Sequence, residues 1–409
     1  MAKHPDGPDE QLIVATCGGG LEPILKQEIL GLPGAGNTGG RARSGGRARS
    51  DAAAARIEAV ESGVVRFRGS AETVVAANRR LRTASRILLP LSSGRAHSYD
   101  QVYALAGAIP WEERISPDAT FAVTAIVRSK TLSNHKFLAM RVKDAVADRQ
   151  RDRLGKRSSV DRKQPDYPIV VHAAEDFVEI SLDASGRSLH ERGYRREAGE
   201  APLRESLAAG LVLRSDWDGS VPLFDPFCGS GTIAIEAALI QAGRFPGDLG
   251  RRYAFERWPE FRGVRPPTPP RAVAAETAAA GPSPAPIIAA DRDPEVLEKA
   301  RRNARRAGVE DRITFVAGAF EELERDEILP IPAGVIITNP PYGERIPYEA
   351  VAVLYQMIGD NLKARYPGWS AWIISANLQA AKRIGLRSSS KTILYNGGLE
   401  SRLYEFQMY

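Results

Sequence analysis

The sequence predicts an α/β protein in which helices and strands alternate along most of the chain. The strongest local observation is a strand, a glycine turn and a helix that follow one another within residues 221–240. The apolar run ends at Asp225, Gly229-Ser230-Gly231 forms the turn, and 232–240 has the composition of a helix. A second observation is the alternation of both element types before residue 184, and a third is a C-terminal hairpin signal at Asn396-Gly397-Gly398.

This strand–turn–helix has the geometry that holds an adenosine-containing cofactor. Glycine lets the backbone come close to a ligand, and the free N–H groups at a helix start face it. No Lys-Ser or Lys-Thr follows the glycines, which argues against a phosphate-cradling P-loop. Ala234 replaces the last glycine of the dinucleotide fingerprint, which tolerates it but becomes less specific. The alternative is a turn with only a conformational role.

The composition indicates an ordinary soluble globular protein with two or three domains. Of 409 residues, 43% are hydrophobic and 26% charged, and no apolar run approaches the length of a membrane helix. The polar N-terminus has no apolar signal region, and the two cysteines, Cys17 and Cys228, provide no disulfide framework. These features predict a reducing, cytoplasmic location. The five histidines are scattered singly, so the sequence predicts no metal site.

The part of the chain before residue 184 is predicted to alternate strands with helices and to end in a hairpin. The strand at 121–127 is apolar on one face and only partly polar on the other, so both faces are expected to be covered. Residues 34–51 contain the hexapeptide GGRARS twice in tandem, which predicts a flexible loop, either a solvated insertion or an RNA contact. The predicted strands are 12–17, 64–68, 87–91, 121–127, 169–173 and 177–182, and the predicted helices are 21–30, 71–81, 99–109 and 136–154.

Residues 128–163 are the most basic part of the chain. They contain twelve Lys or Arg and four Asp, a surplus of eight positive charges, whereas the whole chain carries +6. A charge run is usually a solvated helix face, but its single sign here favours phosphate contact. The sequence therefore predicts a polyanionic partner, in agreement with a pI near 9.3. The candidate contacts on the helix at 136–154 are Lys136, Arg141, Lys143 and Arg149.

The chain after the glycine-turn helix contains an insertion rich in Pro, Ala and Arg at 245–286, followed by an apolar strand that ends at Asp291. This acid lies far beyond the roughly 20 residues expected for a ribose-binding carboxylate. Strand order rather than loop length sets positions in a sheet, so we still predict that role; the alternative is a cap of the next helix. The aromatic residues that could anchor the first part of the insertion are Phe255, Trp258 and Phe261.

A second signature, Asn339-Pro340-Pro341-Tyr342, follows an apolar strand at 335–338. Together with the glycine turn it resembles the Class I S-adenosylmethionine-dependent methyltransferases that modify exocyclic amino groups. A rigid turn is the alternative interpretation of the tetrapeptide alone. The remaining predicted strands of this half are 287–290, 313–316, 371–375, 392–395 and 402–408, and its predicted helices are 232–240, 294–307 and 351–362.

Nearly the whole chain, from residue 12 to 409, resembles the THUMP methyltransferases, and among them the bacterial 23S rRNA guanine-N2 methyltransferases. The N-terminal matches are ATCGGGLEPILKQEI, RLRTASRILLPL, ATFAVTAIVRS and LAMRVKDAVADR, and the C-terminal matches are DPFCGSGT and NPPYGER. The resemblance implies a ferredoxin-like region at 1–90 and a THUMP RNA-binding domain at 91–183. It further implies a Class I, Rossmann-like methyltransferase domain at 184–409, with a low-complexity insertion at about 262–286.

The resemblance also implies S-adenosyl-L-methionine as the cofactor, no metal, and RNA (23S rRNA or a large-subunit precursor) as the partner. In the family the segment 189–213 covers one side of the cofactor pocket and places Glu205 near it. The alternative is that Arg195, Arg196, Arg204 and Glu205 simply form surface pairs, and Arg195 is also a candidate RNA contact. Ala319 stands where related enzymes have an acid for the adenine amino group, which Glu321, Glu322 or a backbone group could replace. The implied cofactor contacts are Asp225, Phe227, Gly229, Gly231, Asp291 and Glu205.

The catalytic residues that the resemblance implies are Asn339, Pro340 and Tyr342. The Asn339 side-chain oxygen and the Pro340 carbonyl would accept both hydrogens of an amino group, and the prolines stiffen the loop. Tyr342 would stack on an extruded base, worth about 1–3 kcal/mol. No strong general base is required, because the methylated, cationic amine loses its proton easily. Most of the catalysis would therefore be positioning.

These features favour methylation of the N2 amino group of a guanine in 23S rRNA. A tRNA guanine-N2 methyltransferase shares the fold and the motifs and is the main alternative. A DNA amino-methyltransferase shares the tetrapeptide, but the THUMP-like half argues against it, and a protein glutamine methyltransferase would not need the basic segment. A non-catalytic RNA-binding or ribosome-assembly factor is opposed by the intact Asn339 and Tyr342.

Overall fold

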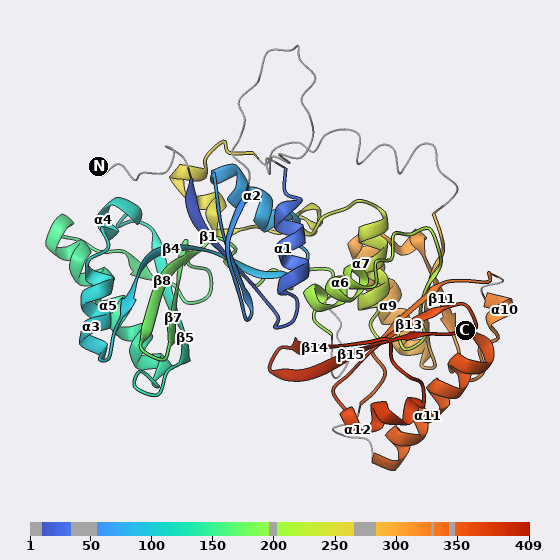
Figure 1. Cartoon of the computed structure of the whole chain (residues 1–409). Coiled ribbons are helices and arrows are strands. Elements are labelled where there is room, and N and C mark those ends of the chain that lie inside the picture. Colours follow the sequence, from blue (N-terminus) through green and yellow to red (C-terminus); the bar gives the residue numbers. More distant parts are fainter. Residues whose placement is uncertain (1–9, 34–54, 196–202, 266–283, 329–330, 343–347) are drawn as a thin grey trace, which may run out of the picture.

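The structure, a computed structural model, has two halves, each built on one β-sheet (Figure 1). The described residues are 10–33, 55–195, 203–265, 284–328, 331–342 and 348–409. The predicted loop at 34–51 and most of the low-complexity insertion lie outside these ranges. Within the described ranges, no helix is both long and apolar enough to span a bilayer.

The N-terminal half contains an eight-stranded sheet in the order β2-β3-β1-β4-β8-β7-β5-β6. The sequence analysis predicted six of these strands and missed β2 and β6, because β2 is largely charged and exposed and β6 has only two residues. The strands are β1 (Gln11–Cys17), β2 (Arg56–Glu61), β3 (Val64–Gly69), β4 (Ala84–Arg95), β5 (Thr120–Arg128), β6 (Ser159–Val160), β7 (Tyr167–Ala174) and β8 (Phe177–Asp183). The helices are α1 (Glu22–Leu30), α2 (Ala71–Arg80), α3 (Tyr99–Gly107), α4 (Trp111–Arg114) and α5 (His135–Leu154).

Strand β4 joins the two regions that the sequence analysis had separated at residue 90. Its first residues pair with β1, from Ala84 to Leu88, and the rest pairs with β8, from Leu88 to Arg95. The expected boundary therefore falls inside a strand. Because β4 is twelve residues long, one sheet continues through both regions.

The long helices of this half pack on one face of the sheet. Apolar residues of α1, α2, α3 and α5 form one core with the inward residues of the strands, such as Phe67 and Phe121. On the other face of β5, Thr124, Ile126 and Arg128 are exposed. The expectation that both faces of this strand are covered is therefore wrong, because the sequence pattern gave no information about where the helices lie.

The C-terminal half contains a seven-stranded sheet in the order β11-β10-β9-β12-β13-β15-β14. The first five strands of this order are parallel, and the β14–β15 hairpin is antiparallel, as the sequence predicted. Helices α6, α7 and α9 pack on one face and α11 on the other, which makes three layers. The strands are β9 (Leu223–Asp225), β10 (Ile287–Asp291), β11 (Ile313–Ala317), β12 (Val335–Thr338), β13 (Ser370–Ser375), β14 (Ser390–Asn396) and β15 (Leu399–Gln407). The helices are α6 (Glu205–Arg214), α7 (Thr232–Gln241), α9 (Pro294–Ala307), α10 (Arg325–Ile328), α11 (Tyr348–Arg365) and α12 (Leu378–Ala381).

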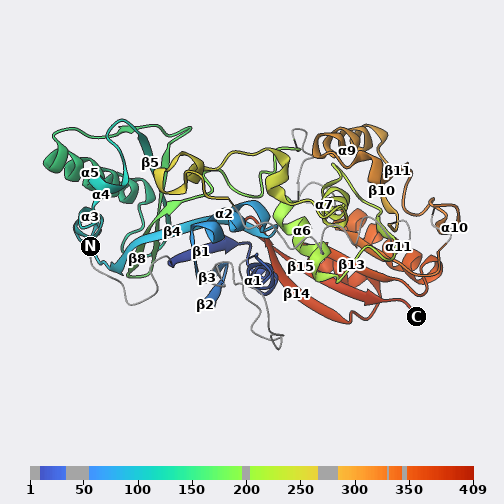
Figure 2. The same cartoon turned by 90° about the horizontal axis from the view of Figure 1, so that it is seen from above.

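Residues 245–261, which we call the anchor segment, leave the C-terminal half and pack on the N-terminal half (Figures 1 and 2). Trp258 is fully buried there; its ring stacks on Tyr167 with centroids 5.4 Å apart, and its Nε1–H donates to the Asp166 carbonyl at 2.8 Å. The guanidinium groups of Arg80 and Arg82 both lie over the Phe245 ring, 5.2 and 5.1 Å from its centroid. Phe255, Trp258 and Phe261 therefore do anchor this segment, but they pack in the core of the N-terminal half.

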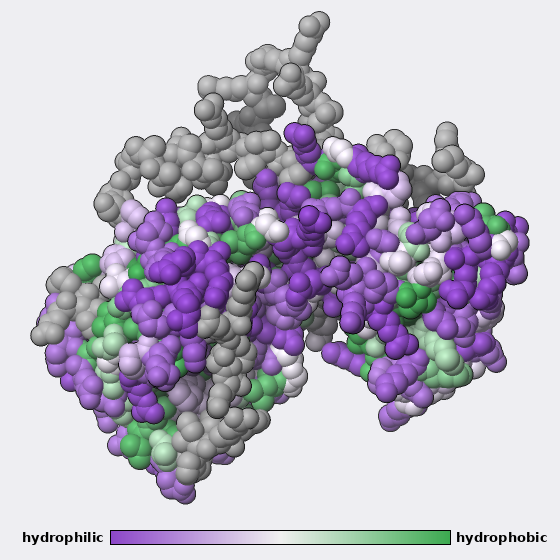
Figure 3. Space-filling model, turned by 180° about the vertical axis from the view of Figure 1, so that it is seen from behind, coloured by the Kyte–Doolittle hydropathy of each residue, from purple (hydrophilic) through white to green (hydrophobic). Residues whose placement is uncertain are grey.

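A buried polar cluster also joins the two halves. Arg192 donates to the Arg82 carbonyl and lies 3.5 Å from the Glu236 carboxylate of α7, and both Arg192 and Glu236 are buried. The Tyr194 hydroxyl donates to the same carboxylate at 3.0 Å. Figure 3 shows two lobes with a recess between them on an outer surface that is mostly hydrophilic.

Candidate active site at the ends of β9, β10 and β12

The sheet order brings the two signature motifs together. Strand β9 lies between β10 and β12, so the order along the chain reverses at β9. Registers of Leu223 with Val335 and of Phe224 with Ile336 align β9 and β12. The glycine turn after β9 and the loop after β12 therefore leave the sheet side by side. The carboxyl edge at such a reversal is where open α/β sheets bind ligands.

The glycine turn needs its glycines. Gly229 and Gly231 have φ angles of +53° and +83°, which L-residues rarely adopt. A Cβ atom on Gly231 would come within 3.0 Å of the Ala300 Cβ atom, whereas one on Gly229 would meet open space. Gly231 thus allows α7 to pack closely on α9, and Gly229 leaves backbone accessible to a ligand.

Asp291 lies across the glycine turn at the end of β10. Its Oδ2 accepts from the Gly229 N–H at 3.0 Å, and its Oδ1 accepts from the Asp293 N–H at 3.0 Å. The cap of α9 is Asp293, whose carboxylate accepts from Glu295 and Val296. Asp291 is therefore not the helix cap. A half-buried carboxylate beside an open glycine backbone has the acceptor that ribose hydroxyls require.

Asp225 connects the two motifs beneath the turn. Its Oδ1 accepts from the Thr338 hydroxyl at 2.7 Å and from the Phe227 N–H at 3.3 Å, and the residue is 1% exposed. Burial raises the pKa of this carboxyl to about 7, against the two hydrogen bonds. These protein contacts favour a supporting role over a direct cofactor contact. Thr338 immediately precedes Asn339, and sequence reasoning missed its part.

The raised pKa of Asp225 makes stability depend on pH. The folded state holds a proton on this carboxyl that the unfolded state loses near pH 4, so its contribution to the free energy of unfolding falls as pH rises towards 7. We expect Asp225→Asn to remove a slope of up to about 1.4 kcal/mol per pH unit, because an amide oxygen accepts the same bonds without ionising. Urea unfolding at pH 5, 6 and 7 measures this.

The control for that experiment is Glu205→Gln, since burial also raises the pKa of Glu205 to about 7. Each single variant is expected to lose only its own share of the slope, and the double variant to lose both. Free energies of wild type and Asp225→Asn that stay parallel between pH 5 and 7 would contradict the assignment.

The aromatic side chains beside the turn form a wall from two loops. Phe227 packs edge-on against Phe320 with centroids 5.7 Å apart, and Phe320 packs on Phe224 of β9. Ala319, which occupies the place of the family's acid, directly precedes Phe320. Glu321 and Glu322 are exposed, so both carboxylates lie on the surface of this loop.

The Asn-Pro-Pro-Tyr loop begins at the end of β12. Asn339 and Tyr342 are half-buried, Pro340 is buried and Pro341 is exposed. The carbonyl of Tyr342 accepts from the Asn377 side-chain amide at 3.3 Å. Asn377 follows β13, and the sequence analysis had no signal for it beyond its place after a strand.

Glu205 and Arg195 form an ion pair that is buried, not a surface pair. Their side chains are 3% and 12% exposed, and the Arg195 guanidinium lies 3.1 Å from the carboxylate. Arg195 also donates to the Leu203 carbonyl at 2.7 Å. Both ends of the segment around 196–202 are therefore tied together. These contacts favour a structural role for Arg195 over a phosphate contact.

The candidate RNA contacts on α5 differ in their availability. Arg149 makes two hydrogen bonds to Glu112 and one to the Gly107 carbonyl, so it fastens α5 to its neighbours. Arg141 pairs with Asp100 and lies over the Tyr103 ring, and Lys143 pairs with Asp144. Lys136 is exposed. Further exposed cations follow the middle of α5, at Arg151, Arg153, Lys156, Arg157, Arg162 and Lys163. Three of these also lie within ion-pair distance of an acid: Arg151 of Asp148, Arg153 of Glu112 and Lys156 of Asp118.

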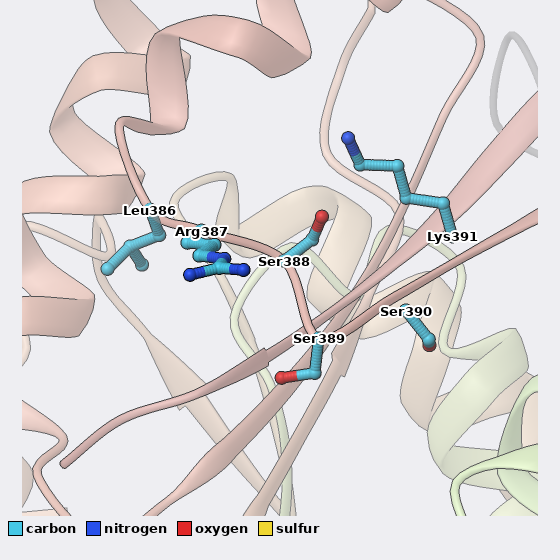
Figure 4. Close-up of a pocket in the computed structure, with 6 residues that line it drawn as sticks. All are labelled: Leu386, Arg387, Ser388, Ser389, Ser390 and Lys391. Carbon is cyan, nitrogen blue, oxygen red and sulfur yellow. The ribbon is translucent and has the colours of Figure 1, made fainter.

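A surface pocket also lies in this half, away from these motifs. It is lined by residues 386–391, the loop that leads into β14 (Figure 4). None of the predicted site residues belongs to it. Among the described residues, no group of three or more His, Cys, Asp or Glu could hold a metal ion.

The fold and the motifs at the carboxyl edge of the C-terminal sheet define a class of protein. A parallel sheet with a closing antiparallel hairpin, a glycine turn with a neighbouring acid, and an Asn-Pro-Pro-Tyr loop on the adjacent strand make the C-terminal half a Class I methyltransferase domain. The comparisons with known proteins identify the family. The model for the "RMKL-like, methyltransferase domain" matches residues 192–405, the THUMP domain matches 96–183, and the "RlmL ferredoxin-like domain" matches 52–88.

The relatives agree with these matches. The chain is 37% identical to ribosomal RNA large subunit methyltransferase K/L of Syntrophotalea carbinolica, over 96% of this chain and 53% of the relative. It is 35% identical to a putative RNA methyltransferase of Synechocystis sp., over 97% of this chain and 96% of the relative. The chain belongs to the family of THUMP-containing RNA methyltransferases close to the 23S rRNA enzymes. It spans about half the length of the K/L relatives that it matches.

Solved structures share the whole architecture. A possible methylase from Clostridium difficile 630 has a TM-score of 0.81 and 29% identity, with 98% of both chains covered. The putative methyltransferase SMU.472, complexed with SAH, has a TM-score of 0.78 and 30% identity, covering 98% of this chain and 99% of that one. SAH is the product that S-adenosylmethionine leaves after methyl transfer. Its presence in a similar chain supports S-adenosylmethionine as the cofactor of this class of protein.

Proposed function

We propose that this protein transfers a methyl group from S-adenosylmethionine to the N2 amino group of a guanine in 23S rRNA. The observation that carries the proposal is the placement of the Asn339 loop beside the Gly229 turn, on adjacent parallel strands. The K/L relatives, named for large-subunit ribosomal RNA, support the choice of RNA.

The residues would divide the work in the following way. The sulfonium of the bound cofactor supplies an electrophilic methyl group. The Gly229 backbone and the Asp291 carboxylate would hold the adenosine part, and Phe227 would line it. The Asn339 side-chain oxygen and the Pro340 carbonyl would accept the two amino hydrogens and aim the nitrogen lone pair. Tyr342 would stack on the extruded base.

The THUMP half would bind the RNA away from the methylated base. The exposed cations at and after the end of α5 are its best candidates for phosphate contact, because they are accessible and outnumber the acids among them, Asp152 and Asp161. Figure 1 shows α5 at the end of the molecule far from the methyltransferase half. The bound RNA would therefore be large enough to span both halves.

A methyl-transfer assay tests the proposal. The protein and tritiated S-adenosylmethionine are incubated with unmodified, transcribed 23S rRNA and, separately, with transcribed tRNA and duplex DNA, followed by nucleoside analysis. Label in N2-methylguanosine from 23S rRNA alone is expected. Label only in tRNA would support the alternative substrate. Label in N6-methyladenosine would overturn the guanine assignment and agree instead with the description of a similar Listeria monocytogenes structure as a predicted N6-adenine-specific DNA methylase.

A further inference from the structure

We propose that Asn377 is a positioning residue for methyl transfer, which holds the carbonyl of Tyr342 and thereby fixes the Asn-Pro-Pro-Tyr loop. The claim about the loop stands on geometry, and only its consequence for turnover rests on the proposed function. No methyltransferase motif of the sequence analysis includes this residue.

The Asn377 side chain performs two tasks at once. Its Nδ2–H donates to the Tyr342 carbonyl at 3.3 Å, and its Oδ1 accepts from the Ala380 N–H at 2.9 Å as the N-cap of α12. The residue stands two positions after β13, the strand beside β12. One side chain therefore ties the end of the catalytic loop to the start of a helix that packs on α11.

The backbone of Asn377 is itself held by buried residues of β13 and α11. Its backbone N–H donates to the Ser375 hydroxyl oxygen at 3.1 Å, and that oxygen lies 2.7 Å from the Tyr355 hydroxyl of α11. Ser375 and Tyr355 are fully buried. A continuous polar chain thus runs from the core of the methyltransferase half to the Tyr342 carbonyl.

The Asn-Pro-Pro-Tyr motif is then held on both sides. At its start, the Thr338 hydroxyl is bonded to Asp225, and at its end the Tyr342 carbonyl is bonded to Asn377. The two residues between Asn339 and Tyr342 are prolines, whose φ angles are locked. Fixed ends and a stiff middle leave the Asn339 and Pro340 acceptors one arrangement, and displacement of about 1 Å can cost on the order of 10²-fold in rate.

Two substitutions separate the hydrogen bond to the Tyr342 carbonyl from the N-cap of α12. Asn377→Asp and Asn377→Ser keep an oxygen that caps α12, since both residues are good N-caps, but neither can donate to Tyr342 as the amide does. We expect an unchanged melting temperature and unchanged cofactor affinity, and turnover lower by about 10- to 100-fold with KM for RNA little altered. Asn377→Ala should also lower the melting temperature, because it removes the cap of α12.

Hydrogen exchange supplies a readout that does not depend on the substrate. In Asn377→Asp and Asn377→Ser, the backbone amides of Thr338, Asn339 and Tyr342 should exchange faster, while those of α12 keep their protection. Gln379→Ala, an exposed neighbour on α12, is the matched control and should change neither. Wild-type exchange of the Thr338, Asn339 and Tyr342 amides in both variants would overturn the role of Asn377 in holding the loop, even if no RNA substrate is found. Faster exchange with wild-type turnover would overturn the positioning role.

Discussion

Asn339→Ala is expected to lower methyl transfer on the order of 10² to 10³-fold while RNA and cofactor affinity stay within about twofold. Asn339 is half-buried at the end of β12, beside the glycine turn, and its oxygen would accept one of the two amino hydrogens of the target base. Truncation leaves that hydrogen unpaired and the lone pair poorly aimed. The adenosine contacts at Gly229 and Asp291 are untouched, so binding should survive.

Single-turnover transfer, a filter-binding assay for RNA and calorimetry for the cofactor measure these three quantities. Asn361→Ala on α11 is the matched control, because it removes the same half-buried side chain outside the site. Loss of RNA binding together with turnover would show that Asn339 acts in binding. Unchanged turnover would show that the loop is only a rigid turn.

Trp258→Ala is expected to have the largest effect on stability, a loss of about 3–5 kcal/mol. The indole is fully buried, stacks on Tyr167 and donates to the Asp166 carbonyl, so truncation removes apolar contact and leaves a cavity. It also weakens the packing of the anchor segment on the N-terminal half. Transfer to full-length RNA should then fall more than cofactor affinity, because the two halves lose a link.

Urea unfolding measures the free energy, and transfer to RNA against cofactor binding measures the coupling. Trp258→Phe keeps a ring on Tyr167 but loses the hydrogen bond and part of the indole volume, so a smaller loss of about 1–3 kcal/mol is expected. A loss below 1 kcal/mol for Trp258→Ala would mean that the anchor segment does not hold the halves together. Equal losses for both variants would show that the ring retained by Trp258→Phe contributes nothing to stability.

The sequence alone indicated much of the methyltransferase half because its signals are local. Glycines at 229 and 231 mark positive φ angles, and the parallel strands appear as short apolar runs between turns. The long insertion does not displace Asp291, since strand order places this acid against the Gly229 N–H whatever the length of the loop. The contacts of these residues with cofactor and RNA stay predictions.

Contacts between distant segments could be decided only by the tertiary structure. The sequence around a buried Trp does not indicate which residue it packs on, so it could not predict that Trp258 packs on Tyr167 of the other half. Positive charge predicted Arg149 and Arg195 as RNA contacts, but an arginine's neighbours decide its role, and theirs are Glu112 and Glu205. The sequence did not point to Asn377, because the role proposed for it depends on one hydrogen bond to the loop after another strand. The sequence determined most of the elements and the residue types of the motifs, whereas side-chain pairing across the fold determined which of the charged residues are held by partners.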